Sequence, residues 1–409
     1  MKYLFFGLLV TLISFELLAQ NKDSLKVNVY IRCSYCDNSY IRNELKSVNY
    51  ARDISDANVI VLGMSEQTGS GGEKYRFIFE GKNEFKGMND TLIFESAQDA
   101  TTEEIRNLYM HHLKLGLLPY FLKTPLGKKI EFEYPETTTT QTTLSTDPWK
   151  GWVISLSTNG SFNGEQSSKS LNIYSNLRIY KITDGWKLTM GASNNYSKSN
   201  YSYDEYTYEY VNRSYNSYIQ YVLSMSDHWS FGMFTSAGSS TFNNFNLNTS
   251  LKPALEYNVF PYKMSFEKQL RISYKIGANY VDYIDTTIFL KTKEILPEQD
   301  LSINFGLVKK WGDIDISIYG SQYLHDLELY ELGSYINFSV RIIKGLSVGL
   351  AAGYSMIRNQ INLSKSDVTQ EELLLRQRQI KTDYSYWGYL GLSYTIGSKF
   401  NNIVNPRFD

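Results

Sequence analysis

Apolar and polar positions alternate along much of the second half of this chain. In the stretch "GLSVGLAAGYSM", the large apolar residues Leu346, Val348 and Leu350 alternate with the small residues Ser347 and Gly349. Successive side chains of a strand point to opposite faces, so one face of this strand is apolar and the other is small or polar. The apolar face can meet the core of a soluble sandwich or the lipid around a membrane barrel.

The connections between such stretches favour the barrel. The alternation recurs in about twelve stretches, each near the ~10 residues expected of a tilted membrane strand. Short turns such as "ITDG", "KWGD" and "IIKG" alternate with long polar segments such as "NYSYDEYTYEY". An even number of strands with short turns at one end is the layout of outer-membrane proteins, whereas a secreted β-sandwich needs fewer and shorter strands. The fold class predicted is mainly β, an antiparallel transmembrane β-barrel of about twelve strands preceded by a small periplasmic α/β domain.

The facing of the strands follows from this interpretation. Leu346, Val348 and Leu350 are expected to face lipid, and Ser347 and Gly349 the lumen. Closure of the barrel would pair every backbone group, as lipid requires. The same alternation assigns eight charged side chains to the lumen: Arg178, Lys187, Lys252, Glu256, Arg271, Lys275, Asp315 and Arg341. Charges in a narrow lumen either pair across it or line a polar path.

The chain divides into five segments by composition. Residues 1–20, "MKYLFFGLLVTLISFELLAQ", have one early lysine and a short apolar core, which is typical of an export signal and too short for a membrane helix. Residues 21–130 mix strand and helix patterns in the order β-α-β-β-β-α and are predicted to form the periplasmic domain. Residues 131–149 are a Thr-rich linker. Residues 150–398 are the predicted barrel, and residues 399–409 a periplasmic tail.

Charge and hydropathy narrow the possible partners. The net charge is −1, so no basic excess indicates nucleic acid. The mean hydropathy of −0.34 is that of a soluble protein, but barrels escape this test because half of each strand faces the lumen. The last stretch, "YLGLSYTI", resembles the signal recognised by the outer-membrane assembly machinery, although further residues follow it. The predicted partners are therefore outer-membrane lipid and, during insertion, that machinery, in a Gram-negative bacterium.

The two cysteines, Cys33 and Cys36, form a CxxC between a predicted strand and a predicted helix. A structural disulfide suits an exported protein. A thioredoxin-like redox site is the alternative, but that fold also uses a cis-proline, and no proline occurs between Asn21 and Leu118. Zinc would need a second ligand pair. We therefore predict a Cys33–Cys36 disulfide, no metal and no cofactor.

The stretches "NVYIRCSYCDNSYIRNELKSVNYARDISDANVIVLG" and "TGSGGEKYRFIFEGKNEFKGMNDTL" are similar to a known family. They resemble the N-terminal region of a group of uncharacterised bacterial outer-membrane β-barrel proteins. The resemblance implies a periplasmic domain carrying a CxxC ahead of a barrel, with a possible periplasmic protein partner. That group has no known activity, so no functional residues can be transferred to this chain.

Two classes of function remain open on the sequence. The first is a passive, porin-like barrel, either a narrow channel or a binding or scaffold protein. The alternative is an outer-membrane hydrolase with a site at the extracellular rim, where "YLHDLELYE" places His325 near Asp326, Glu328 and Glu331. An acid beside a histidine can activate water. Outer loops are commonly acidic, however, and we assign no catalytic residue.

Overall fold

The computed structural model describes residues 26–130, 147–203, 206–366, 378–400, 402 and 407. The predicted export signal, residues 1–20, and most of the predicted linker, residues 131–149, lie outside these ranges. The described strands form a five-stranded sheet in the order β2-β1-β3-β4-β5 and a twelve-stranded sheet that runs from β6 to β17 in chain order. No helix in the described ranges is long and apolar enough to cross a membrane.

The first sheet and its helices form a small α/β domain, which we call the N-terminal domain. Its main elements are β1 (Val27–Arg32), α2 (Asn38–Glu44), β2 (Val48–Tyr50), β3 (Val59–Gln67), β4 (Glu73–Gly81), β5 (Asn89–Ser96) and α3 (Thr102–Leu122). Three short 3₁₀ helices connect or follow them: η1 (Ile54–Asp56), η2 (Asn83–Phe85) and η3 (Pro125–Lys129). The β1–β2 and β1–β3 pairs are parallel, while β3, β4 and β5 are antiparallel.

The core of this domain lies between the sheet and α3. Phe77 and Phe79 on β4 alternate with less buried residues, and both are fully buried together with Leu113 and Leu117 of α3. Helix α3 begins at Thr102, directly after Thr101, which forms a reciprocal capping box with Glu104. The domain contains one strand that the predicted order omits. This is β2, whose three residues are too few to show a period.

The second sheet is antiparallel throughout. Its strands are β6 (Trp152–Gly164), β7 (Ser168–Ile182), β8 (Trp186–Tyr203), β9 (Tyr206–Ser224), β10 (Trp229–Ser240), β11 (Phe245–Asn258), β12 (Lys268–Tyr283), β13 (Lys293–Lys309), β14 (Gly312–Tyr323), β15 (Tyr330–Ile343), β16 (Leu346–Ile357) and β17 (Tyr384–Tyr394). A short helix, η4 (Tyr262–Met264), lies between β11 and β12. This architecture, a twelve-stranded antiparallel sheet after an α/β domain, confirms the predicted fold class.

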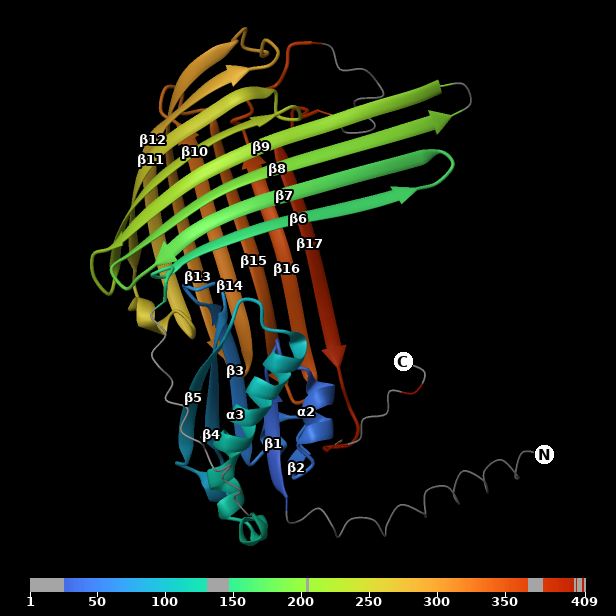
Figure 1. Cartoon of the computed structure of the whole chain (residues 1–409), viewed down its shortest axis with the longest axis vertical. Coiled ribbons are helices and arrows are strands. Elements are labelled where there is room, and N and C mark those ends of the chain that lie inside the picture. The colour runs from blue at the N-terminus through green and yellow to red at the C-terminus, as the bar shows by residue number, and fades with distance from the viewer. Residues whose placement is uncertain are drawn as a thin grey trace, which may run out of the picture.

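The sheet curls back on itself, so that β6 to β9 cross in front of β13 to β17 (Figure 1). Every pair of consecutive strands is hydrogen-bonded, but no pairing joins the edge strands β6 and β17 within the described residues. The expected backbone closure of the barrel is therefore not formed between these two strands. In this view β6 runs in front of β17 and across it (Figure 1).

The register separates two faces of this sheet. Leu350 pairs with Phe338 on β15 and Leu390 on β17, whereas Gly349 pairs with Ser339 and Gly391. Large apolar side chains on the Leu350 face are solvent-exposed across the sheet, for example 55% for Leu251 and 71% for Leu390. We call this the outward face and its opposite the inward face. Soluble monomers rarely expose so extensive an apolar surface.

Candidate functional site: the inward face and the junction with the N-terminal domain

The eight charged residues that the sequence assigns to the lumen all lie on the inward face. The strand registers from β16 to β7 place each of these residues on the same face as Gly349. The residues are Arg178, Lys187, Lys252, Glu256, Arg271, Lys275, Asp315 and Arg341. The structure does not gather them into one cluster, because they sit at different heights on different strands.

Lys252 is the centre of the most compact ionic group on this face. Its Nζ lies 2.6 Å from Glu298 Oε2 and 2.9 Å from Asp300 Oδ2, and Asn279 also donates a hydrogen bond to Glu298. The Lys252 and Glu298 side chains are 15% and 11% exposed. A buried charge needs partners, and here the lysine has two. Sequence reasoning found Lys252 but missed Glu298 and Asp300, because "EILPEQD" shows no strand alternation.

Other members of the set have separate contacts. The Lys275 ammonium lies 4.5 Å from the Phe234 ring centroid, a cation–π distance. Glu256 accepts a hydrogen bond of 2.8 Å from the Tyr262 hydroxyl. Within the part of the chain that the structure describes, no ion pair joins Arg178, Lys187, Arg271 or Asp315 to another residue.

Arg341 leads out of the sheet, to the N-terminal domain. Its Nη1 lies 3.7 Å from Asp53 Oδ2, and its Nη2 donates a hydrogen bond to the Tyr30 hydroxyl. Asp53 also accepts hydrogen bonds from the Ser55 amide and hydroxyl at 2.9 and 2.8 Å. Burial opposes ionisation of Asp53, whose side chain is 4% exposed, but the contacts with Ser55, Arg341 and the Gly345 amide outweigh it. Together they hold the pKa of Asp53 below its ordinary value.

The N-terminal domain contacts several short turns at this end of the sheet. Lys344 in the β15–β16 turn lies 2.6 Å from Asp56, and Lys310 in the β13–β14 turn lies 2.7 Å from Glu80. Arg32 pairs with Asp313 at the start of β14. The Arg76 guanidinium sits 4.2 Å from the ring centroid of a residue in the β11–β12 turn, Phe266.

The β3–β4 hairpin extends these contacts to the far side of the sheet. A Cβ built on Gly69 would lie 3.0 Å from the Ile182 Cβ, and Gly71 lies against the Tyr180 hydroxyl. Both partners belong to the end of β7. The domain therefore reaches the end of β7 and the turns after β11, β13 and β15, and it lies across the short-turn end of the sheet (Figure 1).

The chain after β17 returns to the N-terminal domain. Phe400 forms an antiparallel bridge with Ala51, the Arg52 amide donates to the Lys399 carbonyl at 2.9 Å, and the Tyr50 amide donates to Asn402 at 2.8 Å. Ala51 and Arg52 directly follow β2, which is an edge strand of the first sheet. The predicted tail thus meets the N-terminal domain, which sequence patterns gave no reason to expect.

Cys33 and Cys36 form a disulfide. Both cysteines belong to the hydrophobic core of the N-terminal domain and are less than a tenth exposed. They precede α2, which begins at Asn38 with Asp37 as its cap. The described residues contain no group of three or more side chains placed to hold a metal ion.

The rim residues of the hydrolase alternative are not assembled into a site. The His325 ring lies 5.8 Å from the Tyr323 ring centroid, while Asp326 accepts a hydrogen bond from the Glu328 amide. Glu331 accepts instead from Asn359 and Tyr319. Among the described residues, no hydrogen bond or ion pair joins His325 to any of these three acids.

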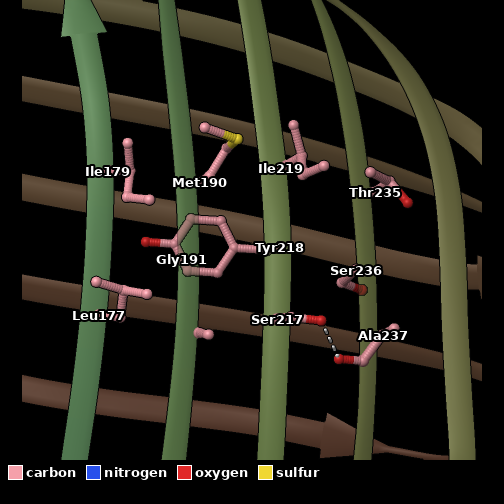
Figure 2. Close-up of a pocket in the computed structure, with 11 residues that line it drawn as sticks. Leu177, Ile179, Met190, Gly191, Ser217, Tyr218, Ile219, Thr235, Ser236 and Ala237 are labelled. Carbon is pink, nitrogen blue, oxygen red and sulfur yellow. Dashed lines mark hydrogen bonds between the residues drawn. The ribbon is translucent and has the colours of Figure 1, made fainter. Parts of the chain in front are cut away.

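A shallow groove of about 330 Å³ lies over β7 to β10 (Figure 2). Ile179, Met190 and Ile219 line this groove on the outward face. Ser217 and Ala237 also line it, and their small side chains leave it open. Tyr218 belongs to the inward face and covers Gly191, which leaves no room there for a Cβ. Apolar side chains around small residues on the outward face fit hydrocarbon chains, and none of the residues that line this groove is charged.

No protein-family model matches the chain, and no curated protein matches it. Among solved structures, similar chains include the NanC porin, with 9% identity over 60% of this chain and 99% of that chain and a TM-score of 0.29. The translocator domain of the autotransporter NalP from Neisseria meningitidis has 10% identity over 59% of this chain and 87% of that chain, with a TM-score of 0.28.

Proposed function

We propose that this protein is an outer-membrane β-barrel protein of the binding or scaffold type, with its N-terminal domain in the periplasm. The observation that carries the proposal is the separation of the two faces of the twelve-stranded sheet. The outward face exposes large apolar side chains from β6 to β17, while the inward face holds the eight charged residues assigned to the lumen. Lipid is the surrounding that such an outward face requires.

The free edges of β6 and β17 fit the same proposal. Unpaired backbone groups are costly in lipid, so these strands must find partners there. β6 leaves the short-turn end and β17 returns to it, so their chain directions are opposite and the two could pair as antiparallel strands if the barrel closes. Closure in the membrane is therefore part of the proposal.

A closed scaffold is favoured over an open channel by the position of the N-terminal domain. The domain lies across the short-turn end and is held there by the pairs Arg341–Asp53, Lys344–Asp56 and Lys310–Glu80. Inside the sheet, Lys252 is neutralised by its two carboxylate neighbours. Solutes would have to pass both the domain and this ionic group.

Conductance in planar bilayers tests the choice between scaffold and channel. The full-length protein should insert and show no ion-selective steps above background. A variant with Asp53→Ala, Asp56→Ala and Glu80→Ala, which removes three carboxylates of the junction, should show more frequent openings. Steady, large conductance of the unmodified protein would identify a channel instead.

The orientation needs its own test. The short turns share their end with the N-terminal domain, so a periplasmic domain places the ends of β8 and β9 outside the cell. An epitope inserted after Asn200 should be labelled on intact cells, and one inserted in the β7–β8 turn at Asp184 should not. The reverse labelling pattern would reject the orientation, and labelling of neither epitope in lysed cells would show only that the insertions prevent assembly.

A further inference from the structure

The upper part of strands β6 to β9, away from the N-terminal domain, has an inward face of unusual composition. Its cross-strand rows consist of Asn159, Tyr174, Asn195 and Ser214, then Ser161, Asn172, Ser197 and Asn212, then Asn163, Ser170, Ser199 and Tyr210, then Ser168, Tyr201 and Tyr208. Every residue in these rows is serine, asparagine or tyrosine. We call this surface the Ser/Asn/Tyr face.

Charges in the same region lie on the opposite face of the strands. Lys198 and Glu209 are cross-strand neighbours there, and their charged atoms lie 2.8 Å apart. The Arg213 guanidinium lies 5.4 Å from the Tyr196 ring centroid, also on that face. The Ser/Asn/Tyr face is therefore uncharged while its reverse is not, although one sheet carries both.

These strand ends reach beyond the thickness of a membrane. β8 and β9 have 18 and 19 residues, whereas about 9–11 residues of a tilted strand cross a bilayer. Figure 1 shows the ends of β6 to β9 projecting past the rest of the sheet. Lys198 and Glu209, on the face that is apolar lower down, mark a part of these strands that lies in water.

The Ser/Asn/Tyr face is accessible. Tyr174 and Tyr208 are 44% and 41% exposed, and Asn172, next to Tyr174 along this face of β7, is also exposed. Rows two residues apart along the strands, and strands about 4.8 Å apart, give a surface of about 20 Å by about 14 Å. Such a surface covers several sugar rings, so it is large enough for a polymer.

We propose that the Ser/Asn/Tyr face binds a neutral polysaccharide at the cell surface. A sugar ring offers an apolar C–H side and a rim of hydroxyl groups. Tyrosine presents a flat apolar ring with a polar end, and asparagine and serine both donate and accept hydrogen bonds. Rigid tyrosines among small polar residues are also the composition of adaptable recognition surfaces.

The same composition argues against other ligand classes. An anionic ligand would find no cation among the residues of these rows, and a cationic ligand would find no carboxylate. Protein interfaces usually have apolar anchors that fill pockets at their centre, and this face has no leucine, tryptophan or methionine. An uncharged ligand rich in hydroxyl groups is the best match.

The test uses the full-length protein purified in detergent and four neutral polysaccharides, dextran, mannan, laminarin and galactan, with heparin and alginate as anionic comparators. We expect at least one neutral polymer to bind and the anionic ones not to bind, as measured by titration calorimetry. The double variant Tyr201→Ala and Tyr208→Ala removes a cross-strand pair of rings from the Ser/Asn/Tyr face and should raise Kd at least about tenfold.

The matched control is Tyr196→Ala, which removes a tyrosine of β8 from the opposite face and should leave Kd within about twofold. Heat-modifiable gel migration reports whether each variant folds, and Asn172→Leu, which keeps all the rings, provides a milder variant that should also weaken binding. The proposal is overturned if no neutral polymer binds, if anionic polymers bind better, or if Tyr196→Ala weakens binding as much as the double variant. The proposal rests on the membrane-spanning part of the proposed function, but binding in detergent can fail while the membrane location stands.

Discussion

Asp53 of the N-terminal domain and Arg341 of β15 form an ion pair, in which Arg341 Nη1 lies 3.7 Å from Asp53 Oδ2. The pair joins the two sheets at a place where Asp53 is almost fully buried. Arg341 was expected from the alternation of β15 to face a lumen. It does lie on the inward face, but at the very end of the strand, where its partner belongs to another domain.

A double-mutant cycle measures this pair. Arg341→Ala leaves a buried carboxylate without its cation, so it should lower the free energy of unfolding of the junction by about 1–3 kcal/mol. Because the residues interact, Asp53→Ala in the Arg341→Ala background should cost less than it costs alone. Urea titration followed by protease cleavage of the N-terminal domain supplies the values. Arg358→Ala, at the opposite end of the sheet, is the control, and strictly additive effects would show that Asp53 and Arg341 do not interact.

The junction should also weaken in acid. The pKa of Asp53 is lower in the folded protein than its ordinary value of about 3.9, so the folded state favours the ionised form. Its contribution is therefore complete above pH ~4 and is lost as the pH falls through the folded pKa. Protease susceptibility of the N-terminal domain should rise below pH ~4 in the unmodified protein, and this step should be smaller in Asp53→Asn. An identical acid response in both proteins would assign the effect to other carboxylates.

The Cys33–Cys36 disulfide should be present in the mature protein. Without reductant, neither cysteine should react with a maleimide in the unfolded chain, and both should react after reduction. Because the described chain buries both sulfurs in the core of the N-terminal domain, Cys33→Ser with Cys36→Ser should also lower the stability of that domain. Full labelling of both thiols before reduction would reject the disulfide. A redox site or a zinc site at the two cysteines would then have to be considered again.

The regular part of this fold could be predicted from the sequence, because its signal is local. Most strands of the large sheet carry their own alternation, as Leu350 and Gly349 show, and each short turn marks a hairpin. The capping residues Thr101 and Glu104 likewise indicate the start of α3, and they lie only three positions apart in the sequence. Such features need no knowledge of distant residues.

The junction could not be predicted in this way, because its partners are far apart in the chain. Asp56 and Glu80 read as ordinary surface acids, and nothing near them indicates Lys344 or Lys310. The tail contact through Phe400 depends on the short strand β2, whose three residues show no period. The Ser/Asn/Tyr face also cannot be recognised without the registers of β6 to β9. These registers decide which residues of neighbouring strands share one face of the sheet.

Substitutions on β16 should separate the two faces. Leu350→Arg places a charge on the outward face and should cost about 2–4 kcal/mol if that position is near the middle of the bilayer. Gly349→Ser should be tolerated, because a Cβ on Gly349 would have no neighbour closer than the Phe338 carbonyl at 3.8 Å. Heat-modifiable migration of each variant in outer-membrane fractions provides the measurement. Loss of the folded form in Gly349→Ser with its retention in Leu350→Arg would reverse the assigned faces.

Spin labels along β16 can show whether the outward face of the twelve-stranded sheet lies in lipid. A nitroxide is attached to a single cysteine placed in turn at Val348, Gly349, Leu350, Ala351 and Ala352 in protein reconstituted into bilayers, with the native cysteines replaced by serine. Relaxation by oxygen, which concentrates in lipid, should be high at 348, 350 and 352 and low at 349 and 351. Relaxation by a water-soluble nickel complex should not peak at the three outward positions. Equal access of the nickel complex to Leu350 and Gly349, with no two-residue period in the oxygen effect, would contradict a membrane-spanning sheet.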